Sequence, residues 1–173
     1  SPGLVPRGQR YMPFYTLWVE GPMARTVEDL ALMLDSMVGQ DIGDPLSFPN
    51  SQDVFVKSLK KDFAPSSVAV SEDLSIVPVD LEVRDGFRAA VKTISNYSWD
   101  ICSDIPDFSG VLDAFKTLRG VLMASMLGDL VTEYKEVILE DIQKNVQLGF
   151  DANGLKIIEA EKIRRDLIIN MES

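Results

Sequence analysis

The clearest pattern in the sequence is a run of apolar residues at helical spacing between two polar or breaking residues. The run consists of Val27, Leu30, Ala31, Leu34 and Val38. Positions i, i+3, i+4, i+7 and i+11 share one face of a helix. Thr26 precedes the run as an N-cap, Glu28 and Asp29 place negative charge in the first turn, and Gly39 follows as a stop. The pattern therefore predicts a capped amphipathic helix from Thr26 to Gly39.

The segments on either side of this helix carry breakers and aromatic residues. Residues 1–13 are rich in proline and glycine and predict an irregular connector. Residues 14–19 are aromatic and branched, which is typical of a short strand or an extended segment that stops at a Gly-Pro turn. Residues 40–50 predict a loop, and residues 51–60 a short helix. Two aspartates of the loop, Asp41 and Asp44, either hold a cation or face solvent, and the lack of regular ligand spacing favours solvent.

A strand, a helix and a second strand follow in order. Residues 67–70 and 97–105 have the branched and aromatic composition of strands. Asp80 caps the helix between them, whose apolar face consists of Val83, Phe87, Ala90, Val91 and Ile94. This order predicts a β-α-β unit with parallel pairing and a right-handed crossover.

From residue 109 onwards the pattern is helical almost throughout. No charged residue lies between Arg119 and Asp129, so this part is expected to be buried on most sides or to line an apolar cavity. Residues 134–148 are amphipathic, and Gly149 is predicted to end their helix. A last helix begins near residue 152 or 155 and runs to 171, with Glu161 and Arg165 as an i,i+4 ion pair.

Composition excludes several classes of function. The 173 residues carry a formal net charge of −10, which argues against nucleic acid or an anionic membrane as partner. With no histidine and one cysteine, Cys102, neither a zinc site, a disulfide framework nor a Ser-His-Asp site is expected. We predict no metal and no cofactor. The absence of a signal peptide and of any long apolar run, together with the single cysteine, predicts a protein of the reducing cytoplasm.

The sequence contains few residues arranged like a known catalytic motif. The pair Ser66-Ser67 follows a proline without any glycine, so we interpret it as the entry to a strand and not as a nucleophile. No G-x-S-x-G, phosphate-binding loop or G-x-G-x-x-G occurs. Met123 and Met126 lie on an apolar helix, where core packing is the default and a ligand channel the alternative.

An ordered series of motifs does resemble a known family. SPGLVP (residues 1–6), EGPMARTVEDLALMLD (20–35), DPLS (44–47), VAVSED (68–73) and PVDLEV (78–83) are similar, in this order, to the region that follows the catalytic motif of amidase signature enzymes. Within the second motif the turn and helix start consist of Gly21, Pro22, Met23, Arg25 and Thr26. The resemblance extends to about residue 107. It also favours residues 4–8 as native sequence, although LVPRG is typical of a thrombin-cleavable linker.

The resemblance implies an α/β fold, part of a mixed-sheet α/β/α sandwich with a helical C-terminal region. We expect a connector at 1–13, an α/β portion at 14–107 and a helical region at 108–173, either in the same domain or as a cover of the substrate channel. It also implies hydrolysis of carboxamide C–N bonds by a serine nucleophile, a second serine in a cis peptide and a lysine base. In the family these three residues lie upstream of the position of Ser1, so this chain is expected to carry no catalytic residue and to be inactive alone.

The expected role of the chain is to support the sheet and to build part of the substrate pocket. Trp18 occupies a place where many family members have aspartate, and we expect it to border the pocket of a small-molecule amide together with Leu122, Met123 and Met126. This departure argues against a substrate like that of the tRNA-dependent amidotransferase A subunit. The apolar stretch from Arg119 to Asp129 and the edges of the small sheet would face the rest of the enzyme, so the chain by itself is expected to expose apolar surface and to self-associate. The alternative is a non-catalytic helical interaction or scaffold module derived from an amidase fold.

Overall fold

The structure is a computed structural model that describes residues 2–8, 12–50, 54–61, 64–97 and 99–172. The chain forms two compact units. One consists of residues 1–62 with 125–135, and the other of residues 63–124 with 136–173. These two units do not test the predicted domain boundaries, which are 1–13, 14–107 and 108–173, and those boundaries stay a prediction.

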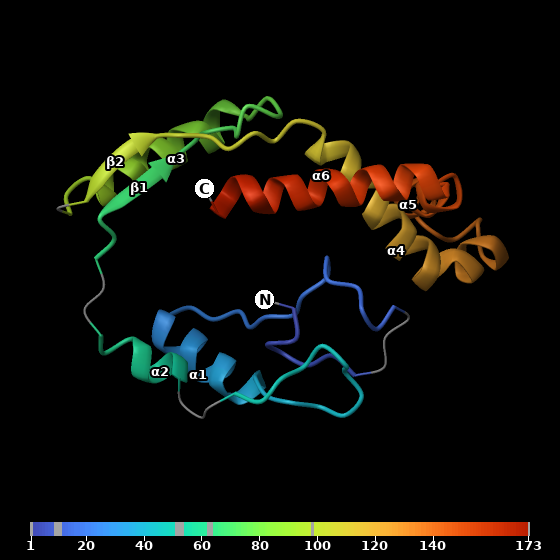
Figure 1. Cartoon of the computed structure of the whole chain (residues 1–173), viewed down its shortest axis with the longest axis horizontal. Helices are drawn as coiled ribbons and strands as arrows, with labels where there is room; N and C mark the ends of the chain where they lie inside the picture. The colour runs from blue at the N-terminus through green and yellow to red at the C-terminus, as the bar shows by residue number, and fades with distance from the viewer. Residues whose placement is uncertain (1, 9–11, 51–53, 62–63, 98, 173) are drawn as a thin grey trace. The chain divides into compact units, whose positions relative to one another are not determined.

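The first unit contains two helices that lie against each other, α1 (Val27–Met37) and α2 (Val54–Ser58) (Figure 1). The predicted N-cap of α1 is confirmed, because Thr26 Oγ1 accepts a hydrogen bond from the Asp29 backbone N–H at 3.1 Å, and the helix ends at Met37, two residues before the predicted stop at Gly39. The carboxylate of Asp35, on α1, accepts hydrogen bonds from the backbone N–H groups of Phe55 and Val56 at 3.1 and 2.9 Å. This carboxylate satisfies donors at the start of α2, so one helix caps the other.

Two predictions about this unit change in the structure. Residues 14–19 have irregular backbone, so the alternative of a strand is wrong; Phe14 is 72% exposed and Val19 49% exposed. A strand forms only where a neighbouring strand can hydrogen-bond to its backbone, and aromatic or branched composition does not provide that neighbour. The helix expected at 51–60 is shorter, five residues from Val54 to Ser58, and residues 51–53 lie outside the described part.

The second unit begins with the predicted β-α-β unit. Strand β1 (Ser67–Val70) pairs in parallel with β2 (Asp100–Ser103), with Val68 opposite Ile101, and α3 (Leu81–Ile94) connects them. Asp80 caps α3 by accepting from the Glu82 N–H at 3.0 Å. The parallel pairing confirms the prediction, although β2 is shorter than the expected 97–105.

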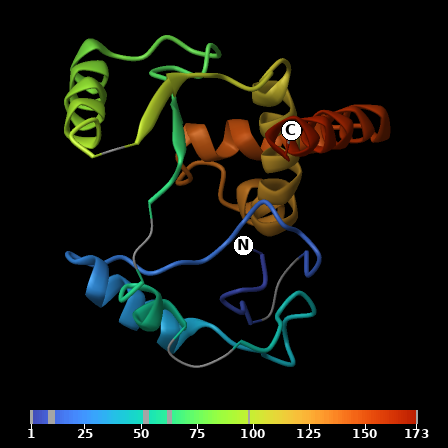
Figure 2. The same ribbon diagram turned by 60° about the vertical axis from the view of Figure 1, so that its left-hand side comes forward.

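Three helices complete the chain, α4 (Val111–Glu133), α5 (Glu140–Phe150) and α6 (Gly154–Glu172), and Figure 2 shows α5 and α6 beside α4. The buried apolar residues of the second unit lie on these helices; they are Ala114, Leu118, Val146 and Ala160. The core of this unit is therefore helical, as the sequence pattern from residue 109 indicates.

Three details of these helices differ from the predictions. Residues 134–139 form turns, so α5 begins at Glu140 and not near 134. Helix α5 ends at Phe150, one residue after the predicted end at Gly149, and a Cβ at Gly149 would come within 2.1 Å of the Gly120 carbonyl oxygen. Glu161 pairs with Arg164 at 3.1 Å, while Arg165 pairs with Asp166 at 2.6 Å, so the predicted Glu161–Arg165 pair is wrong. On a helix, a side chain can pair with one three or four residues away, so spacing alone does not select between Arg164 and Arg165 as the partner of Glu161. Arg165 pairs instead with the adjacent Asp166.

Candidate functional site

The family motif residues form an exposed turn that leads into α1. Gly21 and Arg25 are exposed, Pro22 is half-buried, and Met23 is 90% exposed. Thr26 has a structural role as the N-cap. Apart from its two chain neighbours, no described residue places an atom within 4 Å of a Gly21 Cβ, so contacts among the described residues give no reason for glycine at that position.

The segment before this turn is held by a buried carboxylate. Asp44 is 2% exposed, and its two oxygens accept from the backbone N–H groups of Arg7 and Leu46 at 2.9 and 3.0 Å. Gly3 has a φ of +81°, and a Cβ there would meet the Leu46 carbonyl oxygen at 1.9 Å, so only glycine fits. Asp44 therefore binds backbone donors and fastens residues 3–7 to the loop, instead of facing solvent as the sequence pattern indicates.

Trp18 has a specific partner that sequence reasoning missed. The Arg7 guanidinium carbon lies 5.3 Å from the centroid of the Trp18 ring, and the same side chain donates to the Tyr15 carbonyl oxygen at 3.3 Å. The indole remains 39% exposed. A guanidinium over an indole face is a favourable cation–π contact, so Trp18 is a partly open aromatic surface with a neighbouring cation.

The other predicted pocket residues lie on α4. Leu122, Met123 and Met126 are half-buried. Trp18 and Met126 belong to the first compact unit, and Leu122 and Met123 belong to the second. Their assembly into one substrate pocket therefore stays a prediction.

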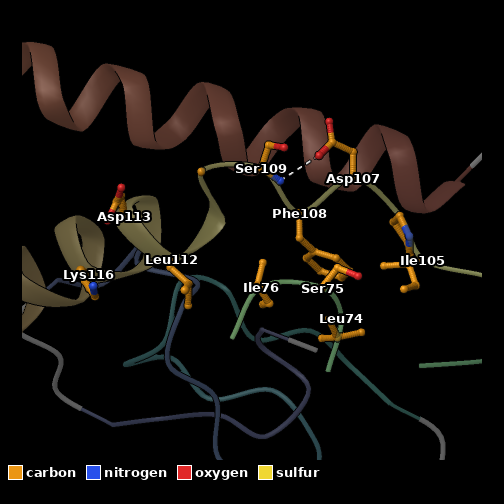
Figure 3. Close-up of a pocket in the computed structure, with 12 residues that line it drawn as sticks. Leu74, Ser75, Ile76, Ile105, Asp107, Phe108, Ser109, Leu112, Asp113 and Lys116 are labelled. Atoms are coloured by element: carbon orange, nitrogen blue, oxygen red, sulfur yellow. Dashed lines mark hydrogen bonds between the residues drawn. The ribbon is translucent and has the colours of Figure 1, made fainter. Parts of the chain in front are cut away.

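A cavity of about 520 Å³ lies where the chain leaves the parallel strand pair (Figure 3). Its walls are the loop after β1, the loop after β2 and the first turns of α4, and the residues that Figure 3 draws include Ile76, Ile105, Phe108 and Leu112. Open parallel sheets bind ligands outside the carboxyl ends of their strands, and the volume is in the range of small-molecule sites. The apolar walls suit the apolar body of a small molecule.

One wall of this cavity has unusual backbone geometry. Leu74 and Ser75 have φ angles of 52° and 56°, a left-handed conformation that L-residues rarely adopt. Two local hydrogen bonds hold it: Leu74 N–H donates to Ser71 Oγ at 2.9 Å, and Ser75 N–H donates to Asp73 Oδ1 at 2.8 Å. The polar loop after β1 thus fixes the shape of the wall.

Charged groups also line the cavity. Hydrogen bonding by the Ser109 side chain, and then by its backbone N–H at 2.8 Å, lowers the pKa of Asp107 below its ordinary value. Asp113 and Lys116 also line the cavity from α4. Asp107 therefore stays ionised under neutral conditions, and the cavity combines apolar walls with both signs of charge.

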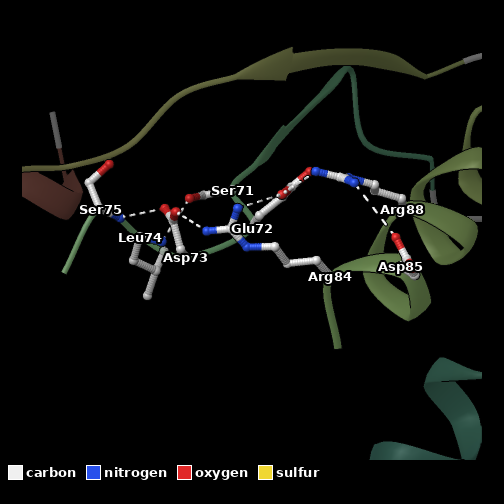
Figure 4. A network of polar contacts seen from close by, with 8 residues as sticks. All are labelled: Ser71, Glu72, Asp73, Leu74, Ser75, Arg84, Asp85 and Arg88. Carbon is white, nitrogen blue, oxygen red and sulfur yellow. Dashed lines mark hydrogen bonds and ion pairs between the residues drawn. The ribbon is translucent and has the colours of Figure 1, made fainter. Parts of the chain in front are cut away.

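An ion-pair network ties α3 to the end of β1 (Figure 4). Arg88 donates to both carboxylate oxygens of Glu72 at 2.6 and 3.0 Å, and Arg84 pairs with Asp73 at 3.0 Å. Arg88 also lies 3.6 Å from Asp85. The hydrogen bond from Arg88 lowers the pKa of Glu72, and the same bond raises the pKa of Arg88. The network supports the strained loop and consists of paired charges.

Comparison with solved structures identifies the class of fold. A bacterial aryl acylamidase of the amidase signature family superimposes with a TM-score of 0.79 over 99% of this chain and 38% of its own, at 20% sequence identity. The α/β architecture of amidase signature enzymes is therefore the fold of this chain. The predicted fold class is confirmed, and within the described residues the sheet is the parallel pair β1 and β2.

Sequence comparison gives the family. The family model Amidase matches residues 1–161, so the chain belongs to the amidase family. An acylamidase of Rhodococcus erythropolis is 41% identical over 81 residues, which are 47% of this chain and 17% of that protein. An amidase of Pseudomonas putida is 23% identical over 145 residues, 83% of this chain and 31% of that protein. The chain thus spans a third or less of the length of these two relatives. Within the described residues, no helix is long and apolar enough to cross a bilayer.

Proposed function

We propose that this chain is the portion of an amidase signature hydrolase that follows the catalytic motif, and that the whole protein hydrolyses a small carboxamide in the cytoplasm. The observation that carries the proposal is the match of residues 1–161 to the amidase family together with partial coverage of its relatives. In this proposal the serine nucleophile, the second serine and the lysine base stand upstream of Ser1, and the chain by itself is inactive. No cofactor and no nucleic acid take part.

The chain's contribution is to support the sheet and to border the substrate. We propose Trp18, Leu122, Met123 and Met126 as pocket residues, since one is an open indole and the others line an uncharged stretch of α4. The names of two relatives, an acylamidase and an aryl acylamidase, support amides with an apolar or aromatic group as the first substrates to test.

The proposal is tested by comparing two proteins on one panel of aliphatic and aryl amides. The open reading frame extended upstream of Ser1 is expected to encode a lysine and a glycine-rich serine motif and to give a protein that releases amine. The isolated chain is expected to release none. Turnover by the isolated chain, titratable with a serine-directed inhibitor, would contradict the assignment of the catalytic residues. A start codon immediately before Ser1 would instead support a non-catalytic helical module.

A further inference from the structure

We propose that Arg7 is a positioning residue that holds the indole of Trp18 as a flat wall for the aromatic or apolar part of the amide substrate. The inference rests on the proposed function and deepens it. It names one specificity-determining pair in that function and the kind of group the pair recognises.

The position of Arg7 is fixed from a buried anchor. Its backbone N–H donates to Asp44, a carboxylate that is 2% exposed. A buried carboxylate that accepts backbone hydrogen bonds is a rigid reference point, because displacing it would leave a charge unpaired in the interior. Arg7 therefore leaves the backbone from a defined place.

The side chain then reaches two groups of the Tyr15–Trp18 segment. It donates to the Tyr15 carbonyl oxygen at 3.3 Å and lies over the Trp18 ring at 5.3 Å. Residues 14–19 have no regular secondary structure, so neither helix nor sheet bonds orient the indole. The arginine fork supplies both a hydrogen bond and a planar cation, a combination that lysine lacks.

The remaining surface of the indole is suited to an apolar planar group. Trp18 keeps 39% of its surface exposed, and it stands two residues before the exposed turn that begins at Glu20. Aromatic rings bind best in offset or edge-to-face contact with another ring, and a ring that is already oriented loses less freedom on binding. Arg7 thus raises the affinity for the non-reacting part of the substrate and takes no part in cleaving the amide C–N bond.

The position of the indole is tested first in this chain, without any activity. In a Trp99→Phe background, Trp18 is the only tryptophan, since the chain contains two. Arg7→Ala should shift Trp18 emission to longer wavelength, as an uncovered indole meets more water, and Arg7→Lys should give a smaller shift. Arg165→Ala, which removes an exposed arginine on α6, should leave the emission unchanged. An unchanged emission in Arg7→Ala would overturn the positioning role.

Specificity is tested next in the upstream-extended protein, with matched aryl and short aliphatic amides. Arg7→Ala and Trp18→Ala should each raise KM for the aryl amide, by at most about two- to ten-fold, the factor expected when one aromatic contact with the substrate is lost. They should change kcat little and raise the aliphatic KM less than the aryl KM, and the double variant should be no worse than Trp18→Ala, since both changes remove one surface. Arg7→Lys should lie between the wild type and Arg7→Ala.

In the extended protein, the inference would be overturned by equal effects on both amides, by an effect on kcat alone, or by effects of the two substitutions that add. An extended protein that cleaves amides with unchanged KM values would overturn this inference and leave the proposed function standing. An extended protein without amidase activity would overturn both.

Discussion

At the scale of single residues, Thr26 shows how a local sequence signal becomes structure. A threonine before two acidic residues and an apolar run predicts a cap, and its hydroxyl accepts from Asp29 N–H in the structure. The hydrogen bond satisfies a donor that the helix leaves open. Thr26 is thus a residue of the family motif with a structural role, as the N-cap of α1.

Replacing this cap should loosen the start of α1. Thr26→Ala removes the acceptor and should cost about 1 kcal/mol of helix stability. Thr26→Ser keeps an acceptor and should retain most of that stability. Hydrogen exchange of the first-turn amides of α1 measures the effect, and equal protection in both variants would contradict the assigned cap.

The Glu72–Arg88 pair makes a prediction about pH. The hydrogen bond from Arg88 lowers the pKa of Glu72 from its ordinary value of 4.5. A carboxyl with a lowered folded pKa stabilises the fold fully above its ordinary pKa, and this contribution is lost as the pH falls through the lower folded pKa. Acid should therefore weaken the attachment of α3 to the end of β1.

The measurement is urea unfolding at neutral pH and at several values below 4.5, the ordinary pKa of Glu72. Glu72→Gln should flatten the acid limb of the stability curve, and Arg88→Ala should flatten it to a similar extent because it removes the other half of the pair. An acid limb that is as steep in both variants as in the wild type would show that other carboxyls carry it.

At the scale of elements, two glycines decide how closely α4 and α5 approach. A Cβ at Gly120 would come within 2.9 Å of the Gly149 backbone nitrogen, and a Cβ at Gly149 within 2.1 Å of the Gly120 carbonyl oxygen. The neighbouring buried residues are Leu118 and Val146, at 3% and 0% exposure. The contact between the two helices therefore depends on backbone lying directly against backbone.

A methyl group at this contact should separate the helices. Gly149→Ala should destabilise the second unit by about 1–3 kcal/mol, the usual cost of overpacking. Gly86→Ala is the matched control, because Gly86 lies within α3 and, among the described residues beyond its own helix backbone, none places an atom within 4 Å of its Cβ position. The control should gain up to about 1 kcal/mol from the better helix propensity of alanine. Thermal unfolding followed by circular dichroism compares the two, and a loss in both would contradict the contact argument.

At the scale of the whole molecule, large apolar side chains remain exposed on several helices. On and beside α1, Met23 is 90%, Val27 62% and Leu32 59% exposed, and Leu155 on α6 is 77% exposed. Val27 belongs to the helix face that the sequence pattern assigns to the interior. Exposed apolar side chains that lie close together on a surface favour association with another apolar surface.

We therefore expect the isolated chain to self-associate. Sedimentation velocity should show species larger than the monomer of 19.2 kDa, and an apolar dye should bind with increased fluorescence. Val27→Glu combined with Leu32→Glu should reduce both signals, whereas Glu28→Ala combined with Ser36→Ala, at exposed polar positions of the same helix, should not. A monomer that binds no dye would count against this expectation.

Sequence reasoning succeeds here where the deciding interactions are local. The caps Thr26 and Asp80, strand β1 and the parallel β-α-β order follow from spacing within a few residues, and the motif series extends this to the family. It fails at residues 14–19 and at the start of α5, where partners elsewhere or competing turns decide. Gly149 lies in an amphipathic pattern, and a glycine in that place can indicate that another helix approaches closely. It can equally indicate the end of a helix.

The sequence by itself determined the amidase resemblance, the elements with strong caps and the charge balance, because each depends only on which residues are present and on their order along the chain. Only the tertiary structure decided that Asp44 anchors Arg7, 37 residues away, that Arg7 covers Trp18, and that Gly120 meets Gly149. The physical reason is that periodicity defines which face of an element is apolar, whereas the partner of that face depends on how the chain packs.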